Sequence, residues 1–235
     1  MHTPHAEDSG PPTTATTTSW RLVIPVKDTR VGKSRLAHLG GANRQRLSLA
    51  IADDTVRAAV ATVGADRVLL VTSDVELRRS WGAQGVSLHD DPDAGLNDAL
   101  AMGLASLGSG SEPGAGHGPY PLAALLGDLP ALRPVDLRSA LDAALPRALS
   151  FVPDSDGTGT VLLCRGMRGG PITPRFGPRS AAAHAGLGAD RLDLDLPRLR
   201  TDVDDDDSLA SAEALGLGAA TRSVLADLRE GASQG

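Results

Sequence analysis

The tetrapeptide Gly127-Asp128-Leu129-Pro130 follows a run of apolar residues, 122–126, that is typical of a buried strand. A carboxylate at the carboxyl end of a strand lies where open α/β sheets bind ligands. Asp128 could hold Mg²⁺ there, because Mg²⁺ in proteins uses one or two carboxylates together with the phosphates of a bound substrate. Taken alone, the tetrapeptide is equally compatible with a solvated aspartate in a turn that ends the strand.

A group of cations follows the first apolar run of the chain, 20–26. Gly32-Lys33-Ser34 resembles the end of a P-loop, but Lys27 stands where that motif needs its first glycine, so an ATPase-type P-loop is excluded. Lys27, Lys33 and Arg35 together could clamp a triphosphate. The alternative is a solvated basic loop.

Two further segments place polar groups at the start of a helix. Ser73 precedes a short helical pattern, and Gly95-Leu96-Asn97 opens a longer one. Free backbone N–H groups and an amide side chain at such a position can bind a base edge or a phosphate. An ordinary capped helix is the simpler interpretation of Gly95 to Asn97.

The segment from Asp154 to Thr160 combines carboxylates, glycines and hydroxyls. Asp154 and Asp156 are candidate metal ligands and Thr160 a candidate phosphate donor, although an Asp-Gly hairpin turn would use the same residue types. Gly177 and Ser180 precede a short helix that Ser180 could cap, which is a second candidate anion site.

The run from Asp202 to Asp207 carries five carboxylates. Such a run is usually a solvated cap before a helix. However, a metal held by Asp128 needs a second carboxylate from elsewhere in the chain, and this acidic run is the best candidate donor.

Strands that alternate with helices predict an α/β fold with a mostly parallel, doubly wound sheet and right-handed crossovers. Pro134 is expected in the first turn of one helix and Asn43 as the cap of another. The expected strands cover 20–26, 67–72, 86–88, 122–126, 151–153, 160–164 and 191–194, and the expected helices cover 43–63, 74–81, 95–107, 134–149, 181–185 and two segments after the acidic run.

Composition limits the other classes of protein. The chain has 235 residues and a net charge of −6, which argues against a general nucleic-acid binder. Its one cysteine, Cys164, excludes an intrachain disulfide framework and a cysteine-based zinc site. Because no run of about 18 apolar residues occurs, we expect no membrane span.

The N-terminal segment 1–19 is rich in Thr, Pro and Ala and lacks the pattern of a signal peptide. We expect it to be a disordered extension. A single domain is expected over 20–231, with a flexible Gly- and Ser-rich insertion at 108–119. The expected location is the cytoplasm.

The order of these segments resembles the 2-phospho-L-lactate or phosphoenolpyruvate guanylyltransferases of deazaflavin coenzyme (F-420) biosynthesis, from about Arg21 to Leu217. The most specific parts are Pro25-Val26-Lys27 with Gly32-Lys33-Ser34-Arg35-Leu36, then Gly95-Leu96-Asn97, then Asp156-Gly157-Thr158-Gly159-Thr160. The resemblance implies the nucleotide-diphospho-sugar transferase-like (Rossmann-like) version of the doubly wound fold.

The resemblance also implies a role for each candidate residue. Asp205-Asp206 stands where the family usually has Thr-Pro, so the identity of the acidic ligands beyond Asp128 is left open. The implied catalytic residues are Lys27, Lys33, Arg35 and Asp128; the nucleotide contacts are Pro25, Lys27, Lys33, Ser73, Gly95, Asn97 and Gly127; the acceptor contacts are Thr160, Gly177 and Ser180, with His184 nearby; and the Mg²⁺ ligands are Asp128 and Asp204, with Asp154 and Asp156 as further candidates.

The implied reaction is transfer of GMP from GTP to the phosphate of phosphoenolpyruvate or 2-phospho-L-lactate, with release of pyrophosphate. The downstream transferase of the pathway would be a transient partner, and a homodimer is left open. Two alternatives remain at this point: a related nucleotidyltransferase that acts on a sugar phosphate or a molybdenum cofactor, and a noncatalytic nucleotide-binding α/β module.

Overall fold

A computed structural model describes residues 20–30, 33–108 and 120–232. The expected extension at 1–19, Gly32 of the basic loop and nearly all of the expected insertion at 108–119 lie outside the described residues. Within the described ranges, no helix combines the length and apolar character needed to cross a membrane.

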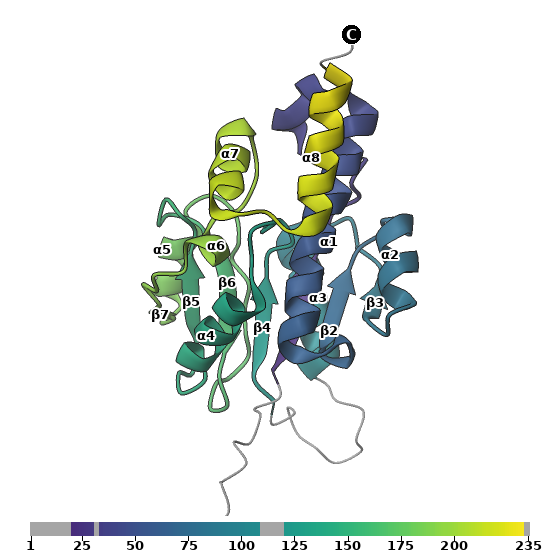
Figure 1. The fold of residues 1–235 in the computed structure, drawn as a ribbon. Helices are drawn as coiled ribbons and strands as arrows, with labels where there is room; N and C mark the ends of the chain where they lie inside the picture. Colours follow the sequence, from purple (N-terminus) through teal and green to yellow (C-terminus); the bar gives the residue numbers. More distant parts are fainter. Residues whose placement is uncertain (1–19, 31–32, 109–119, 233–235) are drawn as a thin grey trace, which may run out of the picture.

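The described chain forms one seven-stranded sheet with the strand order β3-β2-β1-β4-β6-β5-β7. Only β6 runs against the others, since it pairs antiparallel with both β4 and β5. The expected α/β fold with a mostly parallel sheet is therefore confirmed (Figure 1). The strands are β1 Arg21–Pro25, β2 Val68–Val71, β3 Ser87–His89, β4 Leu122–Leu125, β5 Ser150–Pro153, β6 Thr160–Arg165 and β7 Asp190–Arg191.

β1 is the point at which the strand order reverses. It pairs in parallel with β2 on one side and with β4 on the other, and Val23 lies opposite both Leu69 and Ala124. Such a switch point leaves a crevice outside the carboxyl ends of the two central strands, which is where doubly wound sheets bind ligands.

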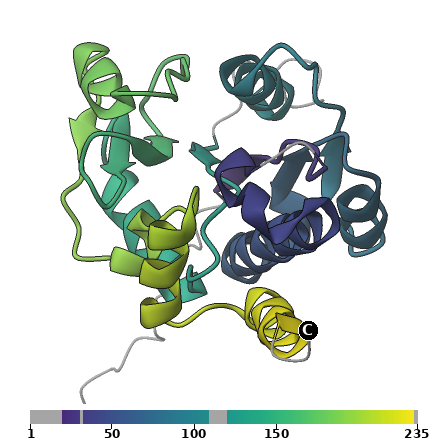
Figure 2. The ribbon, with the colours of Figure 1, turned by 90° about the horizontal axis from the view of Figure 1, so that it is seen from above.

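Helices cover both faces of the sheet, which explains why the central strands are continuous apolar runs. The helices are α1 Gly41–Val63, α2 Val75–Gly82, α3 Leu96–Gly108, α4 Pro134–Ala144, α5 Ser180–Gly186, α6 Pro197–Arg200, α7 Asp206–Leu215 and α8 Ala219–Ala232, with 3₁₀ turns η1 Ser34–Leu39 and η2 Ala65–Arg67. Helices α1 and α4 lie on one face of the sheet, and α3 and α5 lie on the other (Figure 2); their buried side chains belong to two separate hydrophobic clusters.

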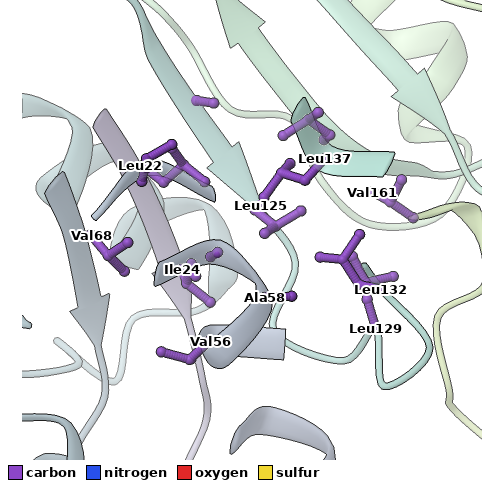
Figure 3. Packing of buried hydrophobic residues seen from close by; sticks show 14 of the residues in the cluster. Leu22, Ile24, Val56, Ala58, Val68, Leu125, Leu129, Leu132, Leu137 and Val161 are labelled. Carbon is purple, nitrogen blue, oxygen red and sulfur yellow. The ribbon is translucent and has the colours of Figure 1, made fainter. Parts of the chain in front are cut away.

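The α1 and α4 face holds the larger hydrophobic cluster. Leu22, Ile24 and Leu125 project from the central strands toward Val56 of α1 and Leu137 of α4, and all five are fully buried (Figure 3). Burying one such side chain stabilises the fold by roughly 1.5–3 kcal/mol. This cluster fixes β1 and β4 against one another, and so fixes the two strand ends that form the crevice.

Three expected helix boundaries are wrong. The helix expected from Asn43 begins at Gly41, because Gly40 takes the cap position with a φ of 77°. The helix expected to reach Leu149 ends at Ala144, where Pro146 soon follows; proline lacks a backbone donor and disfavours helical geometry in the residue before it.

The third boundary concerns Ser180. Arg179 occupies the cap position in a left-handed conformation, with a φ of 59°, and Ser180 is the first helical residue. Ser180 therefore does not cap α5. The short segments η1 and α6 were not expected, because neither carries a full period of apolar residues.

The C-terminal helix is capped by a residue of a different helix. Asp54 of α1 is buried, and its carboxylate accepts hydrogen bonds from the N–H groups of Ala220 (3.1 Å) and Thr221 (2.8 Å) in the first turn of α8. A Cβ atom on Gly218 would lie 2.2 Å from Cγ of Asp54, so only glycine fits there. Asp54 thus joins the end of the chain to α1.

We expect Asp54→Ala to lower the free energy of unfolding by about 1–3 kcal/mol, because it leaves buried N–H groups without partners. Urea denaturation followed by circular dichroism measures the change. Asp53→Ala is the matched control: its carboxylate pairs with Arg57 at the surface, and its removal should cost at most about 1 kcal/mol. Equal losses in the two variants would contradict the capping role of Asp54.

Candidate functional site

The loop after β1 is anchored to the end of β2. The carboxylate of Asp74 accepts hydrogen bonds from the N–H (3.2 Å) and the hydroxyl (2.5 Å) of Thr29. Its other oxygen accepts from the N–H groups of Glu76 and Leu77 and so caps α2. One buried carboxylate therefore holds the basic loop at the carboxyl edge of the sheet.

Lys33 bridges two aspartates at this edge. Its Nζ donates to Oδ2 of Asp128 (2.7 Å) and to Oδ1 of Asp204 (3.2 Å). Burial lowers the pKa of Lys33, but the charges and hydrogen bonds of Asp128 and Asp204 together outweigh it, so the net shift of the pKa is upward. The Lys33 ammonium therefore remains charged.

The backbone around Asp128 fixes this arrangement. The carbonyl of Asp128 accepts a hydrogen bond from the N–H of the buried Val203 at 3.0 Å, so the acidic run is attached to the end of β4. A Cβ atom on Gly127 would lie 2.7 Å from Cγ2 of Val26 and 2.8 Å from the carbonyl oxygen of Pro25. Glycine at 127 thus allows the ends of β1 and β4 to lie side by side.

Asp202 is a residue that we did not single out from the sequence. Burial, followed by the neighbouring charges of Asp128, Asp204 and Asp154, raises its pKa to about 7. Asp202 is therefore close enough to three other carboxylates to feel their charge, and two of these, Asp128 and Asp204, are paired with Lys33. The signal in the sequence was the apolar Val203 inside the acidic run, which marks the point at which this run turns toward the core.

Asp205, the next residue of the acidic run, caps a helix and does not contact Lys33. Asp205 caps α7: its carboxylate accepts from the N–H of Ser208, and the Ser208 hydroxyl accepts from the N–H of Asp205, each at 3.0 Å. The exposed Arg35 lies 3.9 Å from Asp205, so its guanidinium points toward this cap.

A pocket of about 280 Å³ lies at the ends of β1 and β4. Its lining brings together six of the residues that the sequence predicted, and Leu96 at the start of α3 contributes an apolar side. The exposed Lys27 makes no hydrogen bond or ion pair with another described residue. The lining residues are Pro25, Val26, Lys27, Thr29, Lys33, Ser48, Ile51, Ala52, Leu96, Leu126, Gly127, Asp128 and Asp204.

The other predicted nucleotide contacts, Ser73, Gly95 and Asn97, do not line this pocket. Ser73 lies between β2 and α2 on the same edge of the sheet, and Gly95 precedes α3 with a φ of 103°. Asn97 is directed elsewhere: its amide donates to the carbonyl of Phe176 (2.9 Å) and accepts from the N–H of Phe176 (2.7 Å).

The predicted acceptor residues lie around the start of β6 and α5. Thr160 is buried, and its hydroxyl lies 2.9 Å from Nδ1 of the fully buried His184. Burial lowers the pKa of His184 to about 4, so its ring is neutral at physiological pH. Gly177 has a φ of 123°, and its carbonyl accepts from the N–H of Ser180 at 3.1 Å.

The hairpin interpretation holds for the segment from Asp154 to Thr160. The turn joins the antiparallel pair β5 and β6, and the Asp154 carboxylate accepts from the N–H groups of Thr158 (3.0 Å) and Gly159 (2.8 Å) in that turn. Asp156 is exposed in the same turn. Asp154 still lies close enough to Asp202 to raise its pKa.

The donor set at Asp128 suits a hard divalent cation. Oδ1 of Asp128 is buried and has no hydrogen-bond partner among the described residues, while Oδ2 is held by Lys33. No three acidic, histidine or cysteine side chains of the described chain converge as a complete ligand set. Mg²⁺ needs only one or two carboxylates when phosphates supply the remaining oxygens. Asp128 and Asp204 therefore fit a metal that arrives with a phosphate ligand.

Comparison with known proteins finds relatives that cover most of the chain. The chain is 44% identical over 211 residues to the phosphoenolpyruvate guanylyltransferase of Thermomonospora curvata, covering 88% of this chain and 89% of that protein. It is 44% identical over 206 residues to the enzyme of the same name from Salinispora arenicola, with coverages of 86% and 91%. No family model matches the chain.

Solved structures share the fold. A Desulfovibrio desulfuricans protein assigned as a nucleotide-diphospho-sugar transferase aligns with a TM-score of 0.54 at 13% identity, over 74% of this chain and 80% of that one. Rv0371c of Mycobacterium tuberculosis aligns with a TM-score of 0.54 at 18% identity, over 84% and 98%, and it was also solved in complex with manganese. By its sequence relatives, the chain belongs to the phosphoenolpyruvate guanylyltransferase family.

Proposed function

We propose that this protein transfers GMP from GTP to the phosphate of phosphoenolpyruvate, with release of pyrophosphate, in coenzyme F-420 biosynthesis. The observation that carries the proposal is the bridge that Lys33 forms between Asp128 and Asp204, at the switch point of the sheet. The sequence relatives of the chain are named guanylyltransferases. A cation and a carboxylate pair at one strand end can together receive a metal-bound triphosphate.

The proposed chemistry needs no side-chain nucleophile. An oxygen of the acceptor phosphate attacks the α-phosphorus of GTP, a new P–O bond forms, and the bond to the β-phosphate oxygen breaks as pyrophosphate leaves. The acceptor is already an anion, so no general base is required. Such transfers are accelerated mainly by positioning and by neutralisation of charge.

Two sets of residues would provide that neutralisation. Lys33 and the exposed Lys27 face the pocket and would contact the phosphates, while Arg35 adds positive charge nearby. Asp128 and Asp204 would hold Mg²⁺, which offsets part of the triphosphate charge when it is bound. Repulsion between two polyanionic substrates is the main obstacle to this reaction, and these groups oppose it.

The remaining predicted contacts divide between the two substrates. Pro25, Gly127, Ser73 and Gly95 would contact the nucleotide; they lie at the ends of β1, β4 and β2 and before the start of α3. The acceptor phosphate would be bound by Thr160, Gly177 and Ser180. The same phosphate is present in 2-phospho-L-lactate, which remains the second candidate acceptor.

A pyrophosphate-release assay tests the proposal. GTP with phosphoenolpyruvate should release pyrophosphate. Replacing GTP by ATP should lower kcat/KM by orders of magnitude, because the polar groups of a site that pairs with the exocyclic groups of guanine are left unpaired when adenine is bound. The downstream transferase should be present, to consume an unstable product. Release of pyrophosphate only with a sugar phosphate would indicate a related nucleotidyltransferase. Binding of GTP without any release of pyrophosphate would indicate a noncatalytic nucleotide-binding module.

We expect Asp128→Asn to reduce pyrophosphate release by at least about 100-fold, because loss of a metal ligand removes several kcal/mol of charge stabilisation. The amide oxygen introduced at position 128 can still accept from Lys33, whose charge Asp204 continues to offset, so the variant should remain folded. Asp142→Asn, on the exposed side of α4, is the control and should retain full activity. A folded Asp128→Asn variant with near-normal turnover would remove Asp128 from the metal site.

The raised pKa of Asp202 predicts a pH-dependent effect on stability. With a folded pKa of about 7, above its unfolded value, Asp202 stabilises the fold when protonated at low pH, and this stabilisation is lost as the pH rises toward 7. Asp202→Asn should therefore raise the free energy of unfolding at pH 8 by on the order of 1 kcal/mol and by less at pH 5, which lies between the unfolded and the folded pKa.

Thermal unfolding of both proteins in the presence of a chelator, at pH 5 and pH 8, measures this difference. Asp156→Asn, in the exposed hairpin turn, is the control and should show no such dependence. Destabilisation of the Asp202→Asn variant at pH 8 would mean that the ionised carboxylate is favourable in the fold.

A further inference from the structure

A two-point contact joins the start of α3 to a segment 79 residues later in the chain. The Asn97 amide donates to the carbonyl of Phe176 and accepts from the N–H of the same residue, at 2.9 Å and 2.7 Å. One side chain thereby satisfies both backbone polar groups of Phe176. Because the N–H must face a carbonyl oxygen, the orientation of the Asn97 amide is fixed.

A second side chain, that of His184, holds the preceding residue. Nε2 of His184 accepts the N–H of Arg175 at 3.0 Å, so this nitrogen carries no proton. The proton of the neutral ring is therefore on Nδ1, which donates to the Thr160 hydroxyl oxygen. The hydroxyl of Thr160 keeps its own proton for a further acceptor.

Packing reinforces this second contact. The His184 ring is fully buried, lies edge-on to Phe176 with ring centroids 5.2 Å apart, and lies 5.9 Å from Phe151. The segment 166–179 contains no helix or strand, so regular backbone pairing does not hold it. Asn97 and His184 are thus what fixes Arg175 and Phe176, immediately before Gly177.

We propose that Asn97 and His184 are positioning residues, which hold the backbone of Gly177 and the Thr160 hydroxyl in place for the acceptor phosphate. The inference rests on the proposed function, since it assigns these two groups to acceptor binding. It also changes the expected role of Asn97: its amide links the nucleotide side of the site, through the adjacent Leu96, to the acceptor side, and guanine recognition falls to other groups.

The experiment compares Asn97→Ala with Asn43→Ala, a control in the first turn of α1 outside the site. In Asn97→Ala, loss of two hydrogen bonds to the 175–177 segment should raise the KM for phosphoenolpyruvate about tenfold or more. The Kd for GTP should stay within about twofold, because no contact to the pocket is removed. Asn97→Asp, which still accepts the Phe176 N–H, should fall between the wild type and Asn97→Ala.

Hydrogen–deuterium exchange of the peptide that spans 171–179 provides a readout independent of turnover. Exchange should be faster in Asn97→Ala and in His184→Phe, which keeps a ring but loses both hydrogen bonds, and unchanged in Asn43→Ala. If His184→Phe does not fold, Asn97→Ala alone decides the matter.

The outcomes separate the competing explanations. A weaker Kd for GTP with an unchanged KM for phosphoenolpyruvate would make Asn97 a guanine contact and overturn the proposal. Faster exchange with both constants unchanged would make the contacts merely structural and overturn it equally. Unchanged exchange would show that Asn97 does not hold the segment. A wild-type protein without turnover on GTP and phosphoenolpyruvate would instead refute the proposed function. The exchange data would still show whether Asn97 and His184 hold the 175–177 segment.

Discussion

The ion pairs of the Lys33 ammonium group with Asp128 and Asp204 are the interaction on which the site depends. Asp128, Asp202 and Asp204 come from two distant parts of the chain and lie near one another, and Lys33 is hydrogen-bonded to two of them. Like charges repel one another more strongly where water is partly excluded. Without the lysine, the backbone contact of Val203 with Asp128 would have to act against this repulsion at neutral pH. A metal-bound triphosphate would offer a cation to the carboxylates and an anion to Lys33, so both partners of the bridge have a place in the bound state.

Backbone hydrogen bonds hold the segments that carry these charged residues in place. The N–H of Val203 binds the carbonyl of Asp128, and the Thr55 hydroxyl of α1 accepts the N–H of Leu129. The chain then passes through α7 and returns to α1, where Asp54 caps α8. The C-terminal helices are therefore part of the frame of the site, because they keep the acidic run from leaving the sheet edge. This explains how carboxylates far apart in sequence can share one counter-ion.

The parts of this structure that could be predicted are those encoded by local patterns. The apolar runs located the strands β1 to β6, but the strand expected at 191–194 is only the two residues of β7, 190–191. The Gly127-Asp128 turn located the carboxyl end of β4, because a buried strand must end in a polar turn. The antiparallel direction of β6 and the burial of Asp202 could not be predicted, since both depend on which strands become neighbours. The partner of Asn97 lies 79 residues away, and no local pattern indicates it. By contrast, the early end of α4 was visible in Pro146 and was missed.

The two halves of the proposed site are held in physically different ways, and this bears on substrate choice. The triphosphate side is formed by the ends of rigid central strands, whose close approach at Gly127 leaves no room for variation. The acceptor side includes an irregular segment fixed by the side chains of Asn97 and His184. Phosphoenolpyruvate and 2-phospho-L-lactate carry the same phosphate and differ by reduction at one carbon, so groups that bind the phosphate cannot distinguish them. Discrimination must come from side chains that contact the three-carbon unit, and an irregular segment held by two side chains can change those contacts while the triphosphate side stays intact.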